Sequence, residues 1–250
     1  MKTLMINCSP KKRLSASAFI LDLTGLFMRG NQVKDRLRTG ADHRRLLAEM
    51  ETADNVLFAM PLYVDGVPAH VLPFLQAMEA HCRARDLKKN IYVIANNGFI
   101  EGRQNEPLFQ IMENFSRRSG LNWCGGLGIG GGVMMNVMRM MVMVFFAISL
   151  LNLIIGGVQD SLLQTEAIRN LTRQVLVLIV LGSGILAFDI RLATCLNRGK
   201  AYGTHYTRIL LPSFIFILCA DIFFVIISLF QGGLFRGWLA KKKPTAGKPV

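Results

Sequence analysis

The sequence has few cysteines, and their spacing does not support a cysteine-based cofactor site. None of the five cysteines lies in a C-x-x-C pair, so neither an iron–sulfur cluster nor a structural zinc is expected. The four histidines also lack the spacing of metal ligands, and helix-surface positions are their default interpretation. We therefore assign no metal site. Because Cys195 and Cys219 lie in or beside apolar segments, no disulfide framework is expected, which fits a cytosolic soluble part.

Acidic residues are scarce in the second half of the chain. Residues 1–132 carry 17 Lys and Arg against 12 Asp and Glu, whereas residues 133–250 carry 12 against 4. Part of the net charge of +13 therefore flanks apolar segments, where basic residues commonly mark the cytoplasmic side of a membrane. No basic stripe with interleaved aromatic residues is present, so nucleic-acid binding is the weaker explanation. We expect no signal peptide, because the chain begins with the pattern of a core strand.

Long apolar stretches are present only beyond residue 132. Residues 140–158 hold 19 residues without a charge, residues 175–188 hold 14, and residues 209–230 hold 22 that include Asp221. The first and third are long enough for a membrane helix, and the second is borderline. We predict a helical membrane region of two to three spans over residues 133–235 and a basic tail over residues 236–250. Burial in a larger soluble domain is the alternative, but the sheet predicted below already has its own covering helices.

The orientation of this region stays open. A cytosolic domain followed by three spans places the basic tail outside, against the positive-inside rule. Two spans place the tail inside but leave one apolar stretch unexplained.

Residues 1–132 alternate between strand and helix patterns. The predicted strands are residues 4–6, 32–37, 55–60, 91–95 and 121–129, and the predicted helices are residues 15–28, 41–51, 69–80 and 106–119. This alternation predicts an α/β domain with a doubly wound parallel sheet of five strands. Ligands of such sheets bind beyond the carboxyl ends of the strands.

Three loops follow predicted strands and should meet at that edge. The first reads SPKKRLSAS and precedes a helix, and this combination of serines, basic residues and a helix N-terminus is typical of phosphate binding. The second reads PLYVDG and the third NNGF. A surface turn with an N-cap serine is the commoner explanation of the first loop alone. An ordinary half-buried loop aromatic is the alternative interpretation of Tyr63, but the convergence of three loops favours a binding site.

These motifs resemble the flavodoxin-like fold and, within it, the NAD(P)H-dependent FMN reductase-like oxidoreductases. The resemblance spans roughly residues 3–132 and rests on the first loop, the stretch from Ala53 to Pro68, and the N-x-G-F stretch with the following strand into IGGG. Two positions depart from the family pattern: Cys8 replaces the usual glycine, and Ala16 replaces a frequent asparagine.

The resemblance implies an FMN site built from all three loops. Four residues of the first loop are expected to bind the FMN phosphate: Ser9, Lys11, Ser15 and Ser17. Four residues of the second loop are expected along the isoalloxazine ring: Pro61, Leu62, Tyr63 and Val64. Three residues of the third loop are expected at its pyrimidine edge: Asn97, Gly98 and Phe99. FMN itself carries the redox chemistry, so no catalytic side chain is assigned.

The implied function is that of a membrane-tethered, FMN-dependent NAD(P)H oxidoreductase. It would pass electrons from NADH or NADPH through FMN to an unidentified acceptor, which could be a quinone, a free flavin or a membrane redox partner. The alternative is a non-catalytic flavodoxin-like electron carrier or interaction module anchored to the membrane. The expected partners are the nicotinamide cofactor, the acceptor and the lipid membrane. A second copy of the chain is also considered, since proteins of this fold are often dimers. The flavodoxin-like domain, residues 1–132, is expected to be cytoplasmic.

Overall fold

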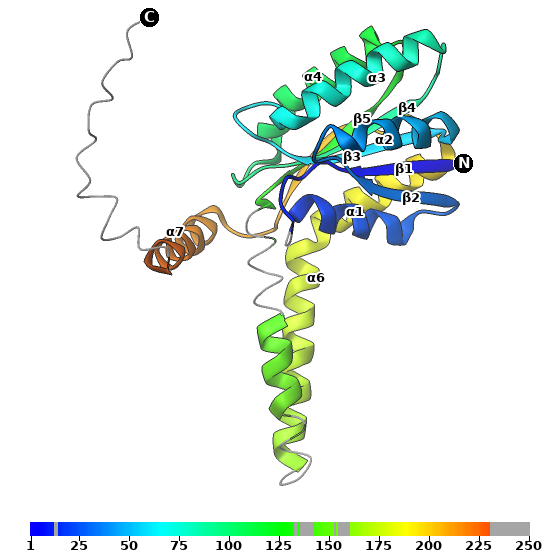
Figure 1. Ribbon diagram of the computed structural model, residues 1–250. Coiled ribbons are helices and arrows are strands. Elements are labelled where there is room, and N and C mark those ends of the chain that lie inside the picture. The colour runs from blue at the N-terminus through cyan, green and yellow to red at the C-terminus, as the bar shows by residue number, and fades with distance from the viewer. Residues whose placement is uncertain (13–14, 133–134, 136–142, 153, 155–160, 231–250) are drawn as a thin grey trace, which may run out of the picture. The chain divides into compact units, whose positions relative to one another are not determined.

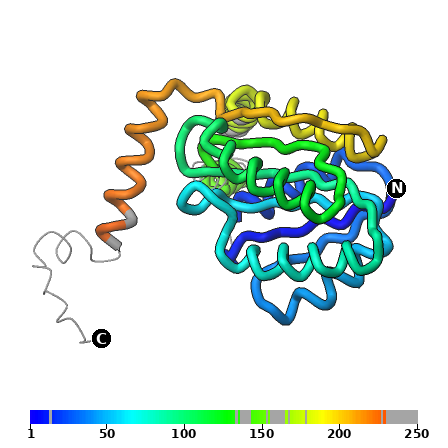
Figure 2. Tube along the Cα trace, turned by 90° about the horizontal axis from the view of Figure 1, so that it is seen from above, coloured from blue at the N-terminus to red at the C-terminus, as the bar shows by residue number. Residues whose placement is uncertain are grey.

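The computed structural model describes residues 1–12, 15–132, 135, 143–152, 154 and 161–230. The chain divides into two compact units, residues 1–210 and residues 211–250. In the first unit, six described strands form one parallel sheet in the order β2-β1-β3-β4-β5-β6, and Figure 2 shows β6 along one edge. The strands are β1 (Lys2–Asn7), β2 (Asn31–Arg36), β3 (Asn55–Pro61), β4 (Asn90–Asn96), β5 (Asn122–Gly130) and β6 (Gly203–Arg208).

Helices cover both faces of the sheet. Figure 1 shows α2, α3 and α4 on one face, and α1 with the second half of α6 on the other. These helices are α1 (Ala16–Phe27), α2 (Ala41–Thr52), α3 (Leu72–Ala84), α4 (Glu106–Arg118) and α6 (Ser161–Arg198). Two short 3-10 helices, η1 (Ala69–Val71) and η2 (Gly102–Asn105), precede α3 and α4. The second unit contains α7 (Ser213–Phe230).

The core lies between the helices and the central strands. Phe58 on β3 and Tyr92 on β4 are fully buried, and Phe58 meets Phe74 of α3 edge-on with ring centroids 6.4 Å apart. Burial on both faces explains why β3 and β4 are almost continuously apolar, as parallel strands between two helical layers must be. The predicted parallel α/β sheet is therefore confirmed.

The predicted number of five strands is wrong, because β6 adds a sixth strand parallel to β5. Its sequence, GTHYTR, contains no apolar run, and its residues are exposed or only partly buried. An edge strand has a neighbour on one side only, so it needs less apolar surface than a central strand. This is why the apolar pattern that identified β3 and β4 did not identify β6.

The second half of α6 packs on the sheet. Leu192, Ala193 and Leu196 are fully buried, and Leu196 O accepts a hydrogen bond from Asn55 Nδ2 (3.0 Å) at the start of β3. The α/β unit thus continues beyond residue 132, where the sequence places the end of the domain, and reaches Leu210.

One described helix, Ile179–Arg198, is long and apolar enough to cross a membrane, judged by its length and composition alone, and 28% of it is buried. Residues 143–152 and Ser213–Ile226 form shorter apolar helices. Residues 140–142, 153 and 155–158 of the first predicted stretch, and the predicted basic tail, lie outside the described residues.

Candidate functional site

A pocket of about 80 Å³ lies at the carboxyl ends of β1, β3, β4 and β5. It is lined by Ser9, Lys11, Ala16, Ser17, Pro61, Leu62, Tyr63, Asn96, Asn97, Gly98 and Gly132. The structure thus brings most of the predicted site residues together, whereas Ser15, Val64 and Phe99 are not in the lining. Ligand clefts commonly hold ~300–1,000 Å³, so a nucleotide at this pocket would extend beyond it along the protein surface.

The first part of the first loop, Ser9 to Lys11, is fixed by three hydrogen bonds. Asn7 Oδ1 accepts from Ser9 N (3.0 Å), and Ser9 Oγ accepts from Lys11 N (3.4 Å). Arg38, which follows β2, donates from Nη2 to Lys11 O (2.7 Å). These bonds hold the loop backbone at the mouth of the pocket and leave the Lys11 side chain exposed.

Asp42 holds Arg38 in place. Its Oδ2 accepts from the backbone N–H groups of Arg38 (2.9 Å) and Thr39 (3.0 Å), and its Oδ1 accepts from Arg45 Nη2 (2.9 Å). Partial burial raises the pKa of Asp42, but these backbone bonds and the Arg45 guanidinium outweigh it and lower the pKa to about 2. Asp42 is therefore ionised at neutral pH and keeps Arg38 where it supports the first loop.

The N-terminus of α1 provides an anion-binding end to the pocket. Ser15 is its N-cap, because its Oγ accepts from Ala18 N (3.2 Å). The backbone N–H groups of the first helical residues, Ala16 and Ser17, have no partner within the helix, and both residues line the pocket. Together with the helix dipole and the Lys11 ammonium, they suit a phosphate. Ser15 thus contributes by capping rather than by lining the pocket.

The hydroxyl of Ser17 has a different partner from the predicted phosphate. Ser17 Oγ donates to Asn96 Oδ1 (2.7 Å), and both side chains are buried. A phosphate oxygen needs a donor, so this hydroxyl cannot donate to it while the bond to Asn96 persists. Sequence reasoning missed Asn96, although its position as the last residue of an apolar strand could have indicated it, and also missed Ala16 and Gly132 as pocket residues.

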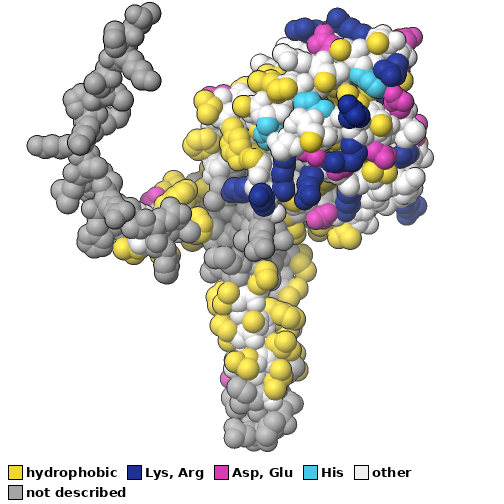
Figure 3. Space-filling model, in the orientation of Figure 1, with side chains coloured by type: hydrophobic (Ala, Val, Ile, Leu, Met, Phe, Trp, Pro, Cys, Tyr) yellow, Lys and Arg dark blue, Asp and Glu magenta, His cyan; other side chains and the backbone are white. Residues whose placement is uncertain are grey.

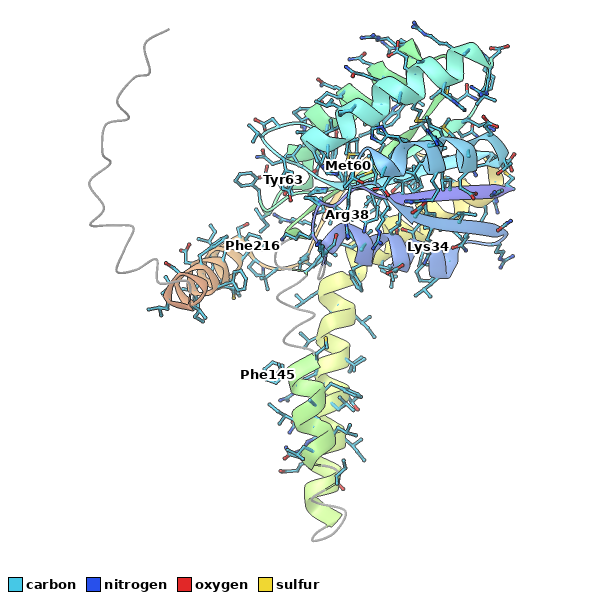
Figure 4. The ribbon with its side chains drawn as sticks, viewed as in Figure 1. Lys34, Arg38, Met60, Tyr63, Phe145 and Phe216 are labelled. Atoms are coloured by element: carbon cyan, nitrogen blue, oxygen red, sulfur yellow. The ribbon has the colours of Figure 1, made fainter. Side chains whose placement is uncertain are left out.

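Tyr63 stands at the pocket edge on a two-residue turn. Tyr63 and Gly66 exchange two backbone hydrogen bonds (3.1 and 3.0 Å), and the intervening Val64 and Asp65 have φ of +47° and +56°. Two consecutive positive φ values define a type I′ turn. Figure 4 shows Tyr63 projecting beyond the end of β3, whereas Met60 lies in the core. The turn therefore presents the Tyr63 ring and directs the fully exposed Val64 to solvent.

Asn97 offers an unused hydrogen-bond acceptor. It is 3% exposed, its Nδ2 donates to Glu101 O (2.9 Å), and its backbone pairs with Ile129 O (3.1 Å) and Gly132 N (2.7 Å). Its Oδ1 has no partner among the described residues. A buried acceptor left unpaired costs about 1–3 kcal/mol, and because this atom itself has almost no exposed surface, a ligand N–H group could pair with it only after the third loop shifts.

Gly132 allows the backbone that follows β5 to pass close to Asn96 and Asn97. A Cβ there would lie 2.7 Å from Asn96 Nδ2 and 3.0 Å from Asn97 O, so a side chain would displace both asparagines. The side chain of the neighbouring Phe99 is exposed and lies outside the pocket lining. Its carbonyl oxygen accepts a hydrogen bond from Gly131 N.

Cys8 is not a reactive thiol. It is fully buried, its N–H donates to Ala59 O (2.8 Å), and His70 Nε2 lies 3.1 Å from its carbonyl oxygen. Burial raises the pKa of the thiol far above its usual range, which keeps it protonated. The Cys8 side chain thus serves packing, and its backbone continues the β1–β3 ladder. No group of three or more potential metal ligands occurs among the described residues.

A second, more open pocket of about 610 Å³ lies beside the same loops. Its lining includes Asp65 of the Tyr63 turn and Glu101 of the third loop, and continues over the start of α4. Arg103 and Glu106 in this lining form an exposed ion pair (3.3 Å). The space next to the first pocket is therefore polar and open to solvent.

No protein-family model matches the chain, and no curated protein matches it. Solved structures that resemble it do so over about half its length. The Trp repressor binding protein of Bacillus subtilis is 17% identical to this chain, and the alignment covers 52% of this chain and 84% of that protein, with a TM-score of 0.42. An NADPH-quinone reductase from P. pentosaceus is 15% identical, and the alignment covers 52% of this chain and 86% of that protein, with a TM-score of 0.42. An NADH:FMN oxidoreductase in its apo form is 13% identical, and the alignment covers 50% of this chain and 73% of that protein, with a TM-score of 0.41. Similarity at these values says nothing about function, which has to be inferred from the residues of the pocket.

Proposed function

We propose that the chain binds FMN at the pocket and passes electrons from NADH or NADPH to an acceptor. The observation that carries the proposal is the convergence of an anion-binding end, a flat aromatic side chain and an unpaired acceptor on one pocket. These three features come from Ala16 and Ser17, from Tyr63 and from Asn97. They match in kind the phosphate, the ring and the polar ring edge of a flavin nucleotide.

The residues of this chain would bind and orient the cofactor rather than react with substrate. The N–H groups of Ala16 and Ser17, with Lys11, would hold the phosphate. Tyr63 would pack along the ring, and after a shift of the third loop Asn97 Oδ1 would accept a hydrogen bond from a ring N–H group, which removes its unpaired state. FMN, when bound, supplies the two-electron redox chemistry. The open space beside the pocket leaves room for a second molecule.

We further propose that apolar helices attach this unit to a membrane and that its α/β part is cytoplasmic. Consecutive residues are exposed on the helix at residues 143–152, where Val144, Phe145 and Phe146 are 53%, 42% and 51% exposed. On α6, Leu176 and Val177 are 57% and 50% exposed. Figure 4 shows Phe145 projecting outward from its helix. Helices that are apolar on all sides suit a lipid environment rather than water.

A second candidate is a non-catalytic electron carrier or interaction module. The bond from Ser17 to Asn96 and the small volume of the pocket favour the interaction module, because both reduce what the site offers to FMN. The two candidates differ in whether a nicotinamide cofactor reduces the bound flavin.

Absorbance of the detergent-purified full chain, incubated with FMN and freed of excess, tests the proposal. We expect a flavin band that NADH or NADPH bleaches without oxygen. Asn97→Leu should weaken FMN binding about 10- to 100-fold, because the loss of one buried hydrogen bond costs about 1–3 kcal/mol. The matched control is Asn122→Leu, an exposed residue at the opposite edge of the sheet. A missing flavin band contradicts the proposal, and bleaching by dithionite alone favours the carrier.

A further inference from the structure

All three apolar segments join the α/β unit at one edge of the sheet. β5 ends at Gly130, and the chain then leads to the helix at residues 143–152. β6 ends at Arg208, and α7 begins at Ser213, five residues later in the chain. Because β5 and β6 are parallel, both connections start from the carboxyl edge.

The third segment, α6, also approaches from the carboxyl edge. Leu181 O accepts from Leu210 N (2.9 Å), and a Cβ at Gly184 would lie 3.2 Å from Thr207 Oγ1, so this part of α6 lies beside the end of β6. At the other end of α6, a Cβ at Gly199 would lie 2.5 Å from Met1 Cε, beside the start of β1. α6 therefore runs antiparallel to the strands. Residues 161–180, which span about 30 Å at ~1.5 Å per residue, precede the part of α6 beside β6. Figure 1 shows the first half of α6 leaving the α/β unit near the carboxyl ends of the strands, at a steep angle to β1 and β2.

The loops at this edge expose apolar and basic side chains together. Val64 is 101% exposed and Phe99 is 64% exposed, and Lys11 and Lys12 are exposed in the first loop. Figure 3 shows Lys and Arg side chains on the α/β unit close to where the apolar helices leave it. Apolar tips beside lysines suit the boundary between lipid headgroups and acyl chains.

We propose that the carboxyl edge of the sheet lies against the membrane surface, so that the candidate pocket opens toward the lipid headgroups. The partner of this surface is the lipid bilayer in which the apolar segments are embedded. The inference rests on the proposed membrane attachment but not on flavin binding. A molecule that partitions into the headgroup region would reach the pocket without crossing bulk water.

The test measures how close each edge of the sheet lies to lipid. The full chain, with Cys219→Ser and Cys195→Ala to remove accessible thiols, receives a nitroxide label at Val64→Cys or, at the opposite edge, at Lys88→Cys. It is reconstituted into vesicles of phosphatidylcholine and phosphatidylglycerol that contain a lipid with a nickel-chelating headgroup. The two edges are separated by about 20 Å, since β4 has seven residues at ~3.3 Å each. We expect headgroup nickel to relax the label at residue 64 several-fold more strongly than the label at residue 88.

Two further measurements make the result decisive. A water-soluble nickel chelate should relax both labels, which shows that both are accessible. Phe99→Cys repeats the measurement on the third loop in case the label disturbs the Tyr63 turn. Equal relaxation at both edges, stronger relaxation at residue 88, or loss of the chain from the vesicles overturns the inference. Because the labels are read without flavin, failure of FMN binding in detergent would refute the proposed oxidoreductase and leave this result unaffected.

Discussion

Val64 occupies a backbone conformation that a β-branched residue rarely adopts. Its φ of +47° lies in the left-handed region, and its side chain is fully exposed, so no described contact compensates the strain. Val64→Asn should therefore raise the free energy of unfolding by about 1 kcal/mol, since asparagine tolerates this region. Thermal unfolding of the detergent-solubilised chain measures the change. Asp65→Asn is the matched control and should be neutral, because aspartate already tolerates the region. A destabilised Val64→Asn variant would mean that the valine side chain stabilises the turn.

The residue types at the pocket could be predicted from the sequence, but their hydrogen bonds could not. Serines, a lysine, an aromatic residue and an asparagine were expected at one edge, and the structure places them there. The bond from Ser17 to Asn96 joins residues 79 apart in sequence, so no local pattern indicates it. Val64 follows Tyr63 directly, but the turn geometry points it away from the pocket. Side-chain direction thus depends on φ values that the residue types alone do not determine.

Among the elements, β5 depends on its glycines for the approach of η2 and α4. A Cβ at Gly128 of β5 would lie 2.8 Å from Gly102 O of η2. In turn, a Cβ at Gly102 would meet the carbonyl oxygens of Thr207 on β6 and Gly128 on β5, the latter at 2.6 Å. A Cβ at Gly126 would lie 2.5 Å from the Phe109 ring of α4. The glycine-rich sequence of β5 is therefore explained by the packing of two elements against it.

Gly102→Ala should force η2 away from both strands and lower the free energy of unfolding by about 1–3 kcal/mol, the usual cost of overpacking. Gly40→Ala is the control, because nothing lies within 4 Å of a Cβ at that position. It should change stability by less than about 0.5 kcal/mol. Chemical denaturation of both variants checks the difference. Equal stabilities would show that η2 can shift without cost.

How well an element could be predicted depended on how deeply it is buried. Strands covered on both faces, such as β3 and β4, need continuous apolar runs, and these runs identified them. β6 pairs with β5 alone and packs through Tyr206, whose ring lies 6.0 Å from that of Phe109. A polar sequence is sufficient for a strand that is only partly buried, so β6 has no apolar pattern by which it could be predicted.

At the scale of the whole molecule, α6 combines two environments in one helix. Near its C-terminal end, Leu192 and Leu196 are fully buried against the sheet, whereas Val177 and Val180 nearer its N-terminus are 50% and 61% exposed. Composition alone does not separate these two environments, because the apolar stretch of residues 175–188 runs from the exposed part of α6 into the part that approaches the sheet. Residues 175–188 therefore resemble a short membrane helix in the sequence, while the α/β unit uses the adjacent turns as a covering helix.

The extent of this unit leads to the last prediction. The sequence places the domain end at Gly132, but a chain that ends there loses α6 and β6. Asn55 Nδ2 then loses its bond to Leu196 O (3.0 Å), and Tyr92 OH loses its bond to Lys200 O (2.9 Å). The apolar side of α1, including Ile20, would lose part of its cover.

We therefore expect the chain of residues 1–132 to aggregate, or to unfold with a free energy at least about 3 kcal/mol below that of residues 1–210. Each lost hydrogen bond contributes about 0.5–1.5 kcal/mol, and the newly exposed apolar surface adds to this. Size-exclusion chromatography and thermal unfolding, with both chains in the same detergent, make the comparison. The chain of residues 1–210 is the matched control, because it keeps the first compact unit whole. If residues 1–132 were monomeric and unfolded at the same temperature as the control, the domain would end at Gly132. In that case the five-stranded sheet of residues 1–132 would be stable by itself, and α6 and β6 would not contribute to its stability.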